Sequence, residues 1–167
     1  MENVFKINWK NDVYCDDNEG TVKLKDTNLL LNGKYEDEYG RIQYFKDGKY
    51  HNENGPSYIK KDVYKEYCIN NKRHRIDGPT VIYASGYIEW FINGNYIDNK
   101  TMDNWLIENN IPLDWDTWTD SDKKKFADYW TEKYGSPYTA DNEPKPEENK
   151  CYTIETKDDV FVLTGDS

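Results

Sequence analysis

Residues 70–94 read NNKRHRIDGPTVIYASGYIEWFING, and this stretch decides the fold. It begins with Asn70-Asn71 and ends with Asn93-Gly94. These residues tolerate a positive φ at both central positions of a tight turn, as a type I′ hairpin requires. Between them, residues 80–83 and 87–92 are rich in the β-branched and aromatic residues typical of strands. The stretch therefore predicts a β-hairpin flanked by tight turns.

The same pattern recurs along the chain at an interval of 23 residues. When His51 is aligned with His74, 8 of the 22 positions from 51 to 72 are identical to their counterparts. Self-similarity at a fixed period is the mark of a repeat architecture. A shortened copy lies 15 residues upstream of Asp47-Gly48. The residues predicted to form turns are Asn32, Gly33, Asp47, Gly48, Gly55, Pro56, Asn70, Asn71, Gly78, Pro79, Asn93 and Gly94.

These turns predict a mainly β fold with a small α part (α+β), in which residues 1–100 form an antiparallel β-hairpin repeat sheet. Alternation along residues 87–92 places Ile88, Trp90 and Ile92 on one face of the sheet. It places Tyr87, Glu89 and Phe91 on the other face. Both faces are mixed, so we expect no strong distinction between inside and outside.

Residues 101–135 are predicted to form a helical cap of two short helices that covers the open end of the sheet. In the first, Thr101 is the expected N-cap and Met102, Trp105 and Leu106 share a face. The second is expected to begin at Thr119 and to end at Gly135. Its expected apolar face consists of Phe126, Tyr129, Trp130 and Tyr134.

The remaining chain is predicted to be a linker over residues 136–150 and a terminal β-hairpin or tail over residues 151–167. Strand-like residues 151–155 and 160–164 flank Lys157-Asp158-Asp159. Such a hairpin could pair with the main sheet or form a detached element.

Residues 70–80 and 86–94 resemble the repeats NGK-x-HR-x-DGPA … G-x-x-x-W-x-x-NG of bacteriophage and giant-virus proteins, which are related in style to MORN-type hairpin repeats. The likeness extends over residues 32–98 and is sharpest in this copy. Residues 51–56 (HNENGP) lack both the Arg and the Asp before Gly. The resemblance implies an antiparallel hairpin array and a viral or bacterial accessory role. It brings no catalytic residues with it.

The composition gives no sign of export or of a membrane span. No apolar run approaches the roughly 20 residues needed to cross a bilayer, and the N-terminus lacks the order of a signal peptide. The three cysteines, Cys15, Cys68 and Cys151, are far apart and odd in number, which favours reduced thiols. We expect a cytoplasmic protein (the host cytoplasm, if viral) that is not secreted.

The net charge of −10 is concentrated toward the C-terminus. Residues 1–100 hold 16 acidic and 15 basic side chains, residues 101–135 hold 8 and 4, and residues 136–167 hold 8 and 3. An acidic chain favours a protein partner with a basic surface over direct contact with nucleic acid. The predicted partner-binding residues are Asp114, Asp116, Asp120, Asp122, Glu143, Glu147, Glu148, Asp158 and Asp159.

No catalytic residue, cofactor or metal is predicted. His51 and His74 occupy equivalent repeat positions, so the repeat itself explains them. A calcium loop counted from Asp114 needs Gly at its sixth position and Glu at its twelfth, where this chain has Thr119 and Lys125. No phosphate loop, dinucleotide fingerprint or nucleophile elbow is present.

We therefore expect a non-catalytic protein-binding accessory protein, encoded by a phage or virus. In its sharpest form it would mimic the charge of nucleic acid and inhibit a host nucleic-acid-handling or defence protein. One alternative is a structural protein of a virion or assembly, which would form homo-oligomers. A second alternative is a hydrolase whose site one sequence does not reveal.

Overall fold

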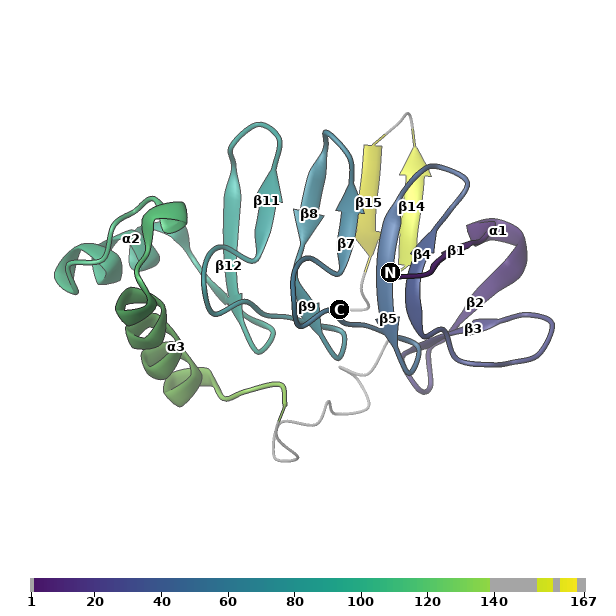
Figure 1. Ribbon diagram of the computed structural model, residues 1–167, viewed down its shortest axis with the longest axis horizontal. Coiled ribbons are helices and arrows are strands. Elements are labelled where there is room, and N and C mark those ends of the chain that lie inside the picture. Colours follow the sequence, from purple (N-terminus) through teal and green to yellow (C-terminus); the bar gives the residue numbers. More distant parts are fainter. Residues whose placement is uncertain (1, 139–152, 158–159, 165–167) are drawn as a thin grey trace.

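A row of β-hairpins forms the centre of the molecule (Figure 1). The computed structural model describes residues 2–138, 153–157 and 160–164. The main sheet has the strand order β1-β4-β5-β7-β8-β11-β12-β13, with β6 paired to β5. Its pairs are antiparallel except for the parallel pair β1–β4. The strands are β1 (Val4–Lys6), β4 (Gly33–Glu36), β5 (Ile42–Lys46), β6 (Lys49–Tyr50), β7 (Tyr58–Lys60), β8 (Tyr64–Glu66), β11 (Val81–Tyr83), β12 (Ile88–Ile92) and β13 (Asn95–Ile97). The predicted mainly β fold with a small α part is confirmed.

Three of the predicted tight turns form where the sequence places them. Asp47 and Gly48 have φ values of 50° and 75°, Asn70 and Asn71 of 49° and 67°, and Asn93 and Gly94 of 49° and 79°. The first pair joins β5 to β6 and the third joins β12 to β13. The second joins β9 (Cys68–Ile69) to β10 (Lys72–Arg73), which form a separate two-stranded ladder. Two consecutive positive φ values are the signature of a type I′ turn.

The prediction of a fourth such turn, at Asn32-Gly33, is wrong. Asn32 does not have a positive φ, and Gly33, with φ 112°, is already the first residue of β4. Just before them, the Leu31 backbone N–H donates to the carbonyl of Val22. The chain thus continues from the hydrogen bond with Val22 into β4 without reversing its direction. The Asn32 side chain instead accepts the backbone N–H of Asp47, at 2.7 Å.

Backbone hydrogen bonds show how successive hairpins stack. The second residue of each tight turn donates its N–H to a carbonyl of the preceding copy. These bonds are Gly48 to Leu31 at 2.8 Å, Asn71 to Tyr50 at 3.0 Å, and Gly94 to Arg73 at 2.9 Å. The Gly55-Pro56 and Gly78-Pro79 pairs lie in the loops that lead into β7 and β11. The turns therefore form a regular row along one edge of the array.

The sheet has two distinct cores, so the expectation of mixed faces without an inside is wrong. One core is an aromatic row, which the N-terminal hairpin of β2 (Val13–Asp16) and β3 (Thr21–Leu24) helps to cover. The other joins Trp90 and Ile92 of β12 to the C-terminal helices. The faces differ because the N-terminal hairpin covers one core and the C-terminal helices cover the other. The buried rings of the first core are Tyr35, Phe45, Tyr50, Tyr58 and Tyr64.

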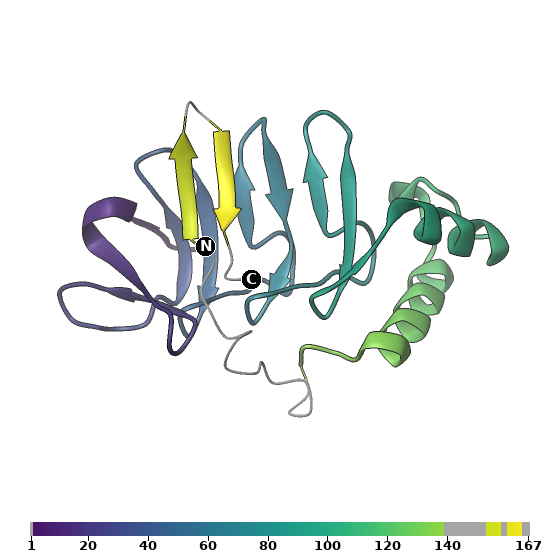
Figure 2. The same cartoon turned by 180° about the vertical axis from the view of Figure 1, so that it is seen from behind.

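Helices α2 (Asn99–Glu108) and α3 (Asp120–Tyr134) lie at the β12 end of the array, opposite α1 (Trp9–Asp12) (Figures 1 and 2). Between them is a short 3₁₀ helix, η1 (Trp115–Thr117). The N-cap of α2 is Asp98 rather than the predicted Thr101. The Asp98 carboxylate accepts the Thr101 backbone N–H at 2.8 Å, and a carboxylate directly after the last strand, β13, can satisfy the exposed N–H groups of the first helical turn.

The predicted start and end of the second helix are confirmed. Thr119 is its N-cap in a reciprocal capping box with Asp122, and Gly135, with φ 83°, follows its last residue. Phe126 and Trp130 are buried beside the α2 residues Met102, Trp105 and Leu106, whereas Tyr129 is largely exposed.

The C-terminal strands β14 (Thr153–Lys157) and β15 (Val160–Thr164) form the predicted hairpin and pair with each other, not with the main sheet. Of the predicted linker, residues 136–138 are described and residues 139–150 lie outside the described residues. Within the described chain, no helix has the length and apolar character needed to cross a membrane.

Candidate functional site: a cleft between two repeats

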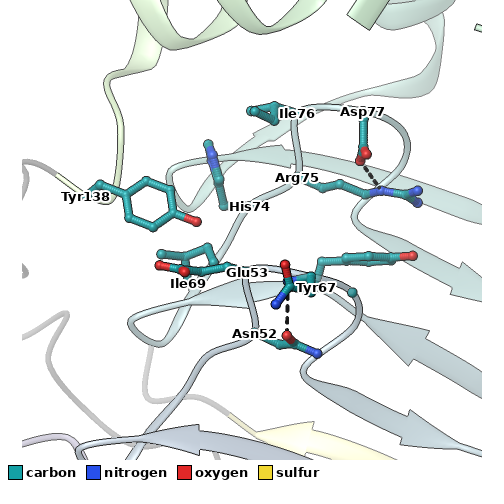
Figure 3. A pocket seen from close by; sticks show the side chains of 11 residues that line it. Asn52, Glu53, Tyr67, Ile69, His74, Arg75, Ile76, Asp77 and Tyr138 are labelled. Atoms are coloured by element: carbon teal, nitrogen blue, oxygen red, sulfur yellow. Dashed lines mark hydrogen bonds and ion pairs between the residues drawn. The ribbon is translucent and has the colours of Figure 1, made fainter. Parts of the chain in front are cut away.

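Two equivalent loops of consecutive repeats, residues 51–55 and 74–78, face each other across a cavity of about 310 Å³. We call this cavity the inter-repeat cleft (Figure 3). Tyr138, which follows α3 in the chain, lies at its mouth. The lining residues are Asn52, Glu53, Asn54, Gly55, Tyr67, Ile69, His74, Arg75, Ile76, Asp77 and Tyr138.

The two histidines beside the cleft hold the array together. The His51 Nδ1 atom accepts the backbone N–H of Asn70 at 3.1 Å, and the His74 Nδ1 atom accepts that of Asn93 at 3.0 Å. Each ring therefore links the segment that follows one tight turn to the first residue of the next tight turn along the array. The sequence identified their equivalence but not this bond, which depends on two segments 19 residues apart meeting in space.

Burial favours the neutral form of both rings. Burial lowers the pKa of His74 to about 4. Burial also lowers the pKa of His51, while the Glu53 carboxylate, whose Oε1 lies 3.4 Å from His51 Nε2, acts in the opposite direction. A neutral ring can accept a hydrogen bond at Nδ1, which is the role observed here.

On the opposite wall, the Arg75 side chain is held by several contacts at once. Its Nε donates to Asp77 at 2.8 Å, one terminal nitrogen donates to the Pro79 carbonyl at 3.0 Å, and the guanidinium lies 4.1 Å from the centroid of the Tyr67 ring. A Cβ at Gly78 would lie 2.8 Å from the guanidinium carbon. Glycine at this position thus leaves room for the arginine. The positive charge of Arg75 balances the negative charge of Asp77. The carboxylate of Glu53 therefore gives the cleft a net negative charge.

Residues 134–138, which we call the strap, lie against the turn ends. The Asn93 side-chain amide donates to the Tyr134 carbonyl at 3.1 Å, and the Asn70 amide donates to the Pro137 carbonyl at 3.4 Å. The Tyr138 ring centroid lies 6.4 Å from that of His51 and 6.4 Å from that of His74, with the ring planes nearly perpendicular. Sequence patterns do not predict this arrangement. The one signal in the sequence is that asparagine occupies the first turn position in two successive copies.

The predicted acidic residues of the helical region are not gathered around this cleft as a set. Asp114 and Asp122 help to cap helices. The Asp114 carboxylate accepts the backbone N–H of Asp116 at the start of η1, and the Asp122 carboxylate accepts that of Thr119 at the start of α3. Asp116 and Asp120 are exposed. The three lysines at 123–125 directly follow and offset this charge. The other predicted partner-binding residues, Glu143, Glu147, Glu148, Asp158 and Asp159, lie outside the described residues.

Buried charged groups elsewhere in the sheet are paired with one another. The Asp37 carboxylate accepts hydrogen bonds from Arg41 and Gln43, and Gln43 accepts one from Tyr50. Glu66 pairs with Arg73, although burial raises the pKa of Glu66. No group of three or more His, Cys, Asp or Glu side chains among the described residues is placed to hold a metal ion.

Comparison with protein-family models, with curated proteins and with solved structures finds no match for this chain.

Proposed function

We propose that this protein is a non-catalytic protein-binding protein and that the inter-repeat cleft and its neighbouring turn ends make the contact. The observation that carries this proposal is the strap. The short segment that leaves α3 is bound there through two backbone carbonyls and one tyrosine ring. A surface that binds one segment in this way has the donors and the shape to bind another.

The roles of the polar side chains favour binding over catalysis. A general base needs a free basic atom within reach of a substrate proton. Here each histidine uses Nδ1 to accept a backbone N–H. Arg75 is held by a carboxylate, a carbonyl and a ring.

The charge of the cleft supports a partner with a basic surface. The Glu53 side chain is 55% exposed at the rim, and the chain carries a net charge of −10. Complementary charge speeds association and makes it sensitive to salt. Inhibition of a host protein through its basic surface is the accessory role that follows from this proposal.

The test is photo-crosslinking with an unnatural residue in place of Ile76, an exposed residue at the cleft. The control carries the same residue in place of Leu29, which is exposed between β3 and β4 and does not line the cleft. We expect one protein to crosslink through position 76 but not through position 29, and its yield to fall between low and high salt. Equal crosslinking at both positions would refute a contact at the cleft.

Light scattering on the purified protein distinguishes the structural alternative. A virion or assembly protein would associate with itself at all salt concentrations, because contacts between apolar and aromatic surfaces are not screened by salt. A protein that binds a separate partner through the cleft requires no such self-association.

A further inference from the structure

The first position of each tight turn forms a row along the array. The equivalent residues are Asp47, Asn70 and Asn93, all with φ values near 50° and all at the same place in their copies. Two of the three are asparagines, and both donate their side-chain amides to carbonyls of the strap. The carbonyls they bind belong to Tyr134 and Pro137, which are three residues apart.

This spacing matches the pitch of the array. Each copy adds two strands to the sheet, and neighbouring strands are about 4.8 Å apart, so equivalent positions lie roughly 10 Å apart. Three residues of extended chain span about the same distance, and a polyproline II helix also returns to the same face every third residue. An extended peptide can therefore present one carbonyl to each successive turn.

The residue after the second carbonyl has its own slot. Tyr138 follows Pro137, and its ring stands edge-on between His51 and His74. It remains 54% exposed, and the cavity of about 310 Å³ lies beside it. The slot thus suits an aromatic side chain and has room that Tyr138 does not fill.

The third member of the row has the opposite chemistry. Asp47 is exposed, and its carboxylate only accepts hydrogen bonds, whereas an asparagine amide also donates. A peptide that extends along the row toward Asp47 would therefore favour a cationic side chain there over a carbonyl.

We propose that the turn ends bind an extended peptide in the register of the strap. One carbonyl is bound by Asn70, the next residue places an aromatic ring between the two histidines, and a lysine or arginine two residues further on faces Asp47. This inference rests on the proposed protein-binding function and names the chemistry of the partner. Residues 136–138 act as an internal ligand of the same site, which the peptide displaces.

The strap contact is weak enough for this exchange. Residue Tyr134 stays at the end of α3, while displacement of residues 136–138 breaks the bond from Asn70 to Pro137 and withdraws a half-exposed ring. A single hydrogen bond of this kind contributes about 1 kcal/mol.

The test uses the full-length protein and the fluorescein-labelled peptide Gly-Ser-Pro-Tyr-Ala-Lys, followed by fluorescence anisotropy. We expect saturable binding that becomes several-fold tighter in Tyr138→Ala, because this change removes the internal competitor. Replacing the peptide tyrosine by alanine, or its lysine by glutamate, should weaken binding by about fivefold, the effect of one contact of about 1 kcal/mol.

Two protein variants test the register. Asn70→Asp keeps a residue that this turn accepts, since Asp47 occupies the equivalent position, but removes the donor. It should weaken binding by about fivefold, whereas the control Asn11→Asp, on the exposed α1, should not. Asp47→Asn should abolish the preference for lysine over glutamate.

Two results would overturn the inference. One is the absence of saturable binding to Tyr138→Ala at millimolar peptide, and the other is binding that neither Asn70→Asp nor the loss of the peptide tyrosine alters. If position 76 still crosslinked a partner, the cleft would remain a protein-binding site and only the register proposed here would be rejected. Loss of both signals would reject the proposed function as well.

Discussion

Glycine at the second turn position has different roles in two copies of the repeat. Gly48 and Gly94 have φ values of 75° and 79°. A Cβ at Gly48 would lie 2.8 Å from the Thr21 Cβ and 2.9 Å from the Val22 carbonyl oxygen, whereas at Gly94 the nearest atom, in Lys72, is 3.9 Å away. Only the first glycine lies under the N-terminal hairpin.

Gly94→Ala should therefore cost only the backbone strain of a left-handed alanine, about 1–2 kcal/mol. Gly48→Ala should cost that strain plus a clash with packed atoms, about 2–4 kcal/mol in all. Urea unfolding of both variants measures the difference. Equal losses would show that the N-terminal hairpin moves aside at no cost.

His74 predicts a loss of stability in acid. Its pKa of about 4 in the folded protein lies below the value of about 6.5 of an unfolded histidine. The unfolded chain therefore binds the proton first, and the contribution of His74, complete above pH 6.5, is lost as the pH falls toward 4. The full effect is on the order of 3 kcal/mol.

The variant His74→Asn checks this effect, because its side-chain oxygen can still accept the Asn93 N–H but does not titrate. Its free energy of unfolding should fall less between pH 7 and pH 4.5 than that of the wild type. The carboxylates titrate in both proteins, so the difference between the two curves isolates the histidine. Parallel curves would contradict the burial argument.

At the scale of the element, the N-terminus of α3 is held by the capping box of Thr119 and Asp122. Thr119→Ala should destabilise the protein by about 1 kcal/mol. Ser121→Ala is the matched control, since Ser121 is exposed in the first turn and should change stability little. Thermal unfolding followed by circular dichroism at 222 nm measures both. A neutral Thr119→Ala would mean that helix packing alone fixes this end.

The elements that the sequence predicted are those with local signals. Asn70-Asn71 and Asn93-Gly94 specify their turns by the φ values they tolerate, and Thr119 and Gly135 mark the ends of a helix. Asn32-Gly33 carries the same local signal and fails, because the residues before it pair with β3. The strands β2 and β3 have only four residues each and no copy in the repeat, so periodicity could not find them.

The strap could not be predicted for a different reason. Residues 134–138 carry no motif of their own, and their contacts with Asn70 and Asn93 span 67 and 41 residues. Only the folded array brings equivalent asparagines into a row. The candidate site is therefore a property of the repeat spacing together with the path of the chain after α3.

At the scale of the whole molecule, β12 connects the two cores. Its Trp90 and Ile92 belong to the core with the helices, and Phe91 packs against the aromatic core of the sheet. The Trp90 ring lies 6.3 Å from that of Trp118 and 5.8 Å from that of Phe126. Because one strand serves both cores, the array and the helices should unfold together.

The wild-type protein should accordingly show coincident urea transitions by tryptophan fluorescence and by far-ultraviolet circular dichroism. Trp90→Ala should cost about 3–5 kcal/mol and separate the two, with the helices lost before the sheet. Ile107→Ala, at a position 61% exposed on α2, is the control and should leave the transitions coincident. Since the strap begins at the end of α3, the helices position it against the turn ends. Separate transitions in the wild type would mean that the helices unfold while the array stays folded, and the position of the strap would then be governed by the helices rather than by the repeat.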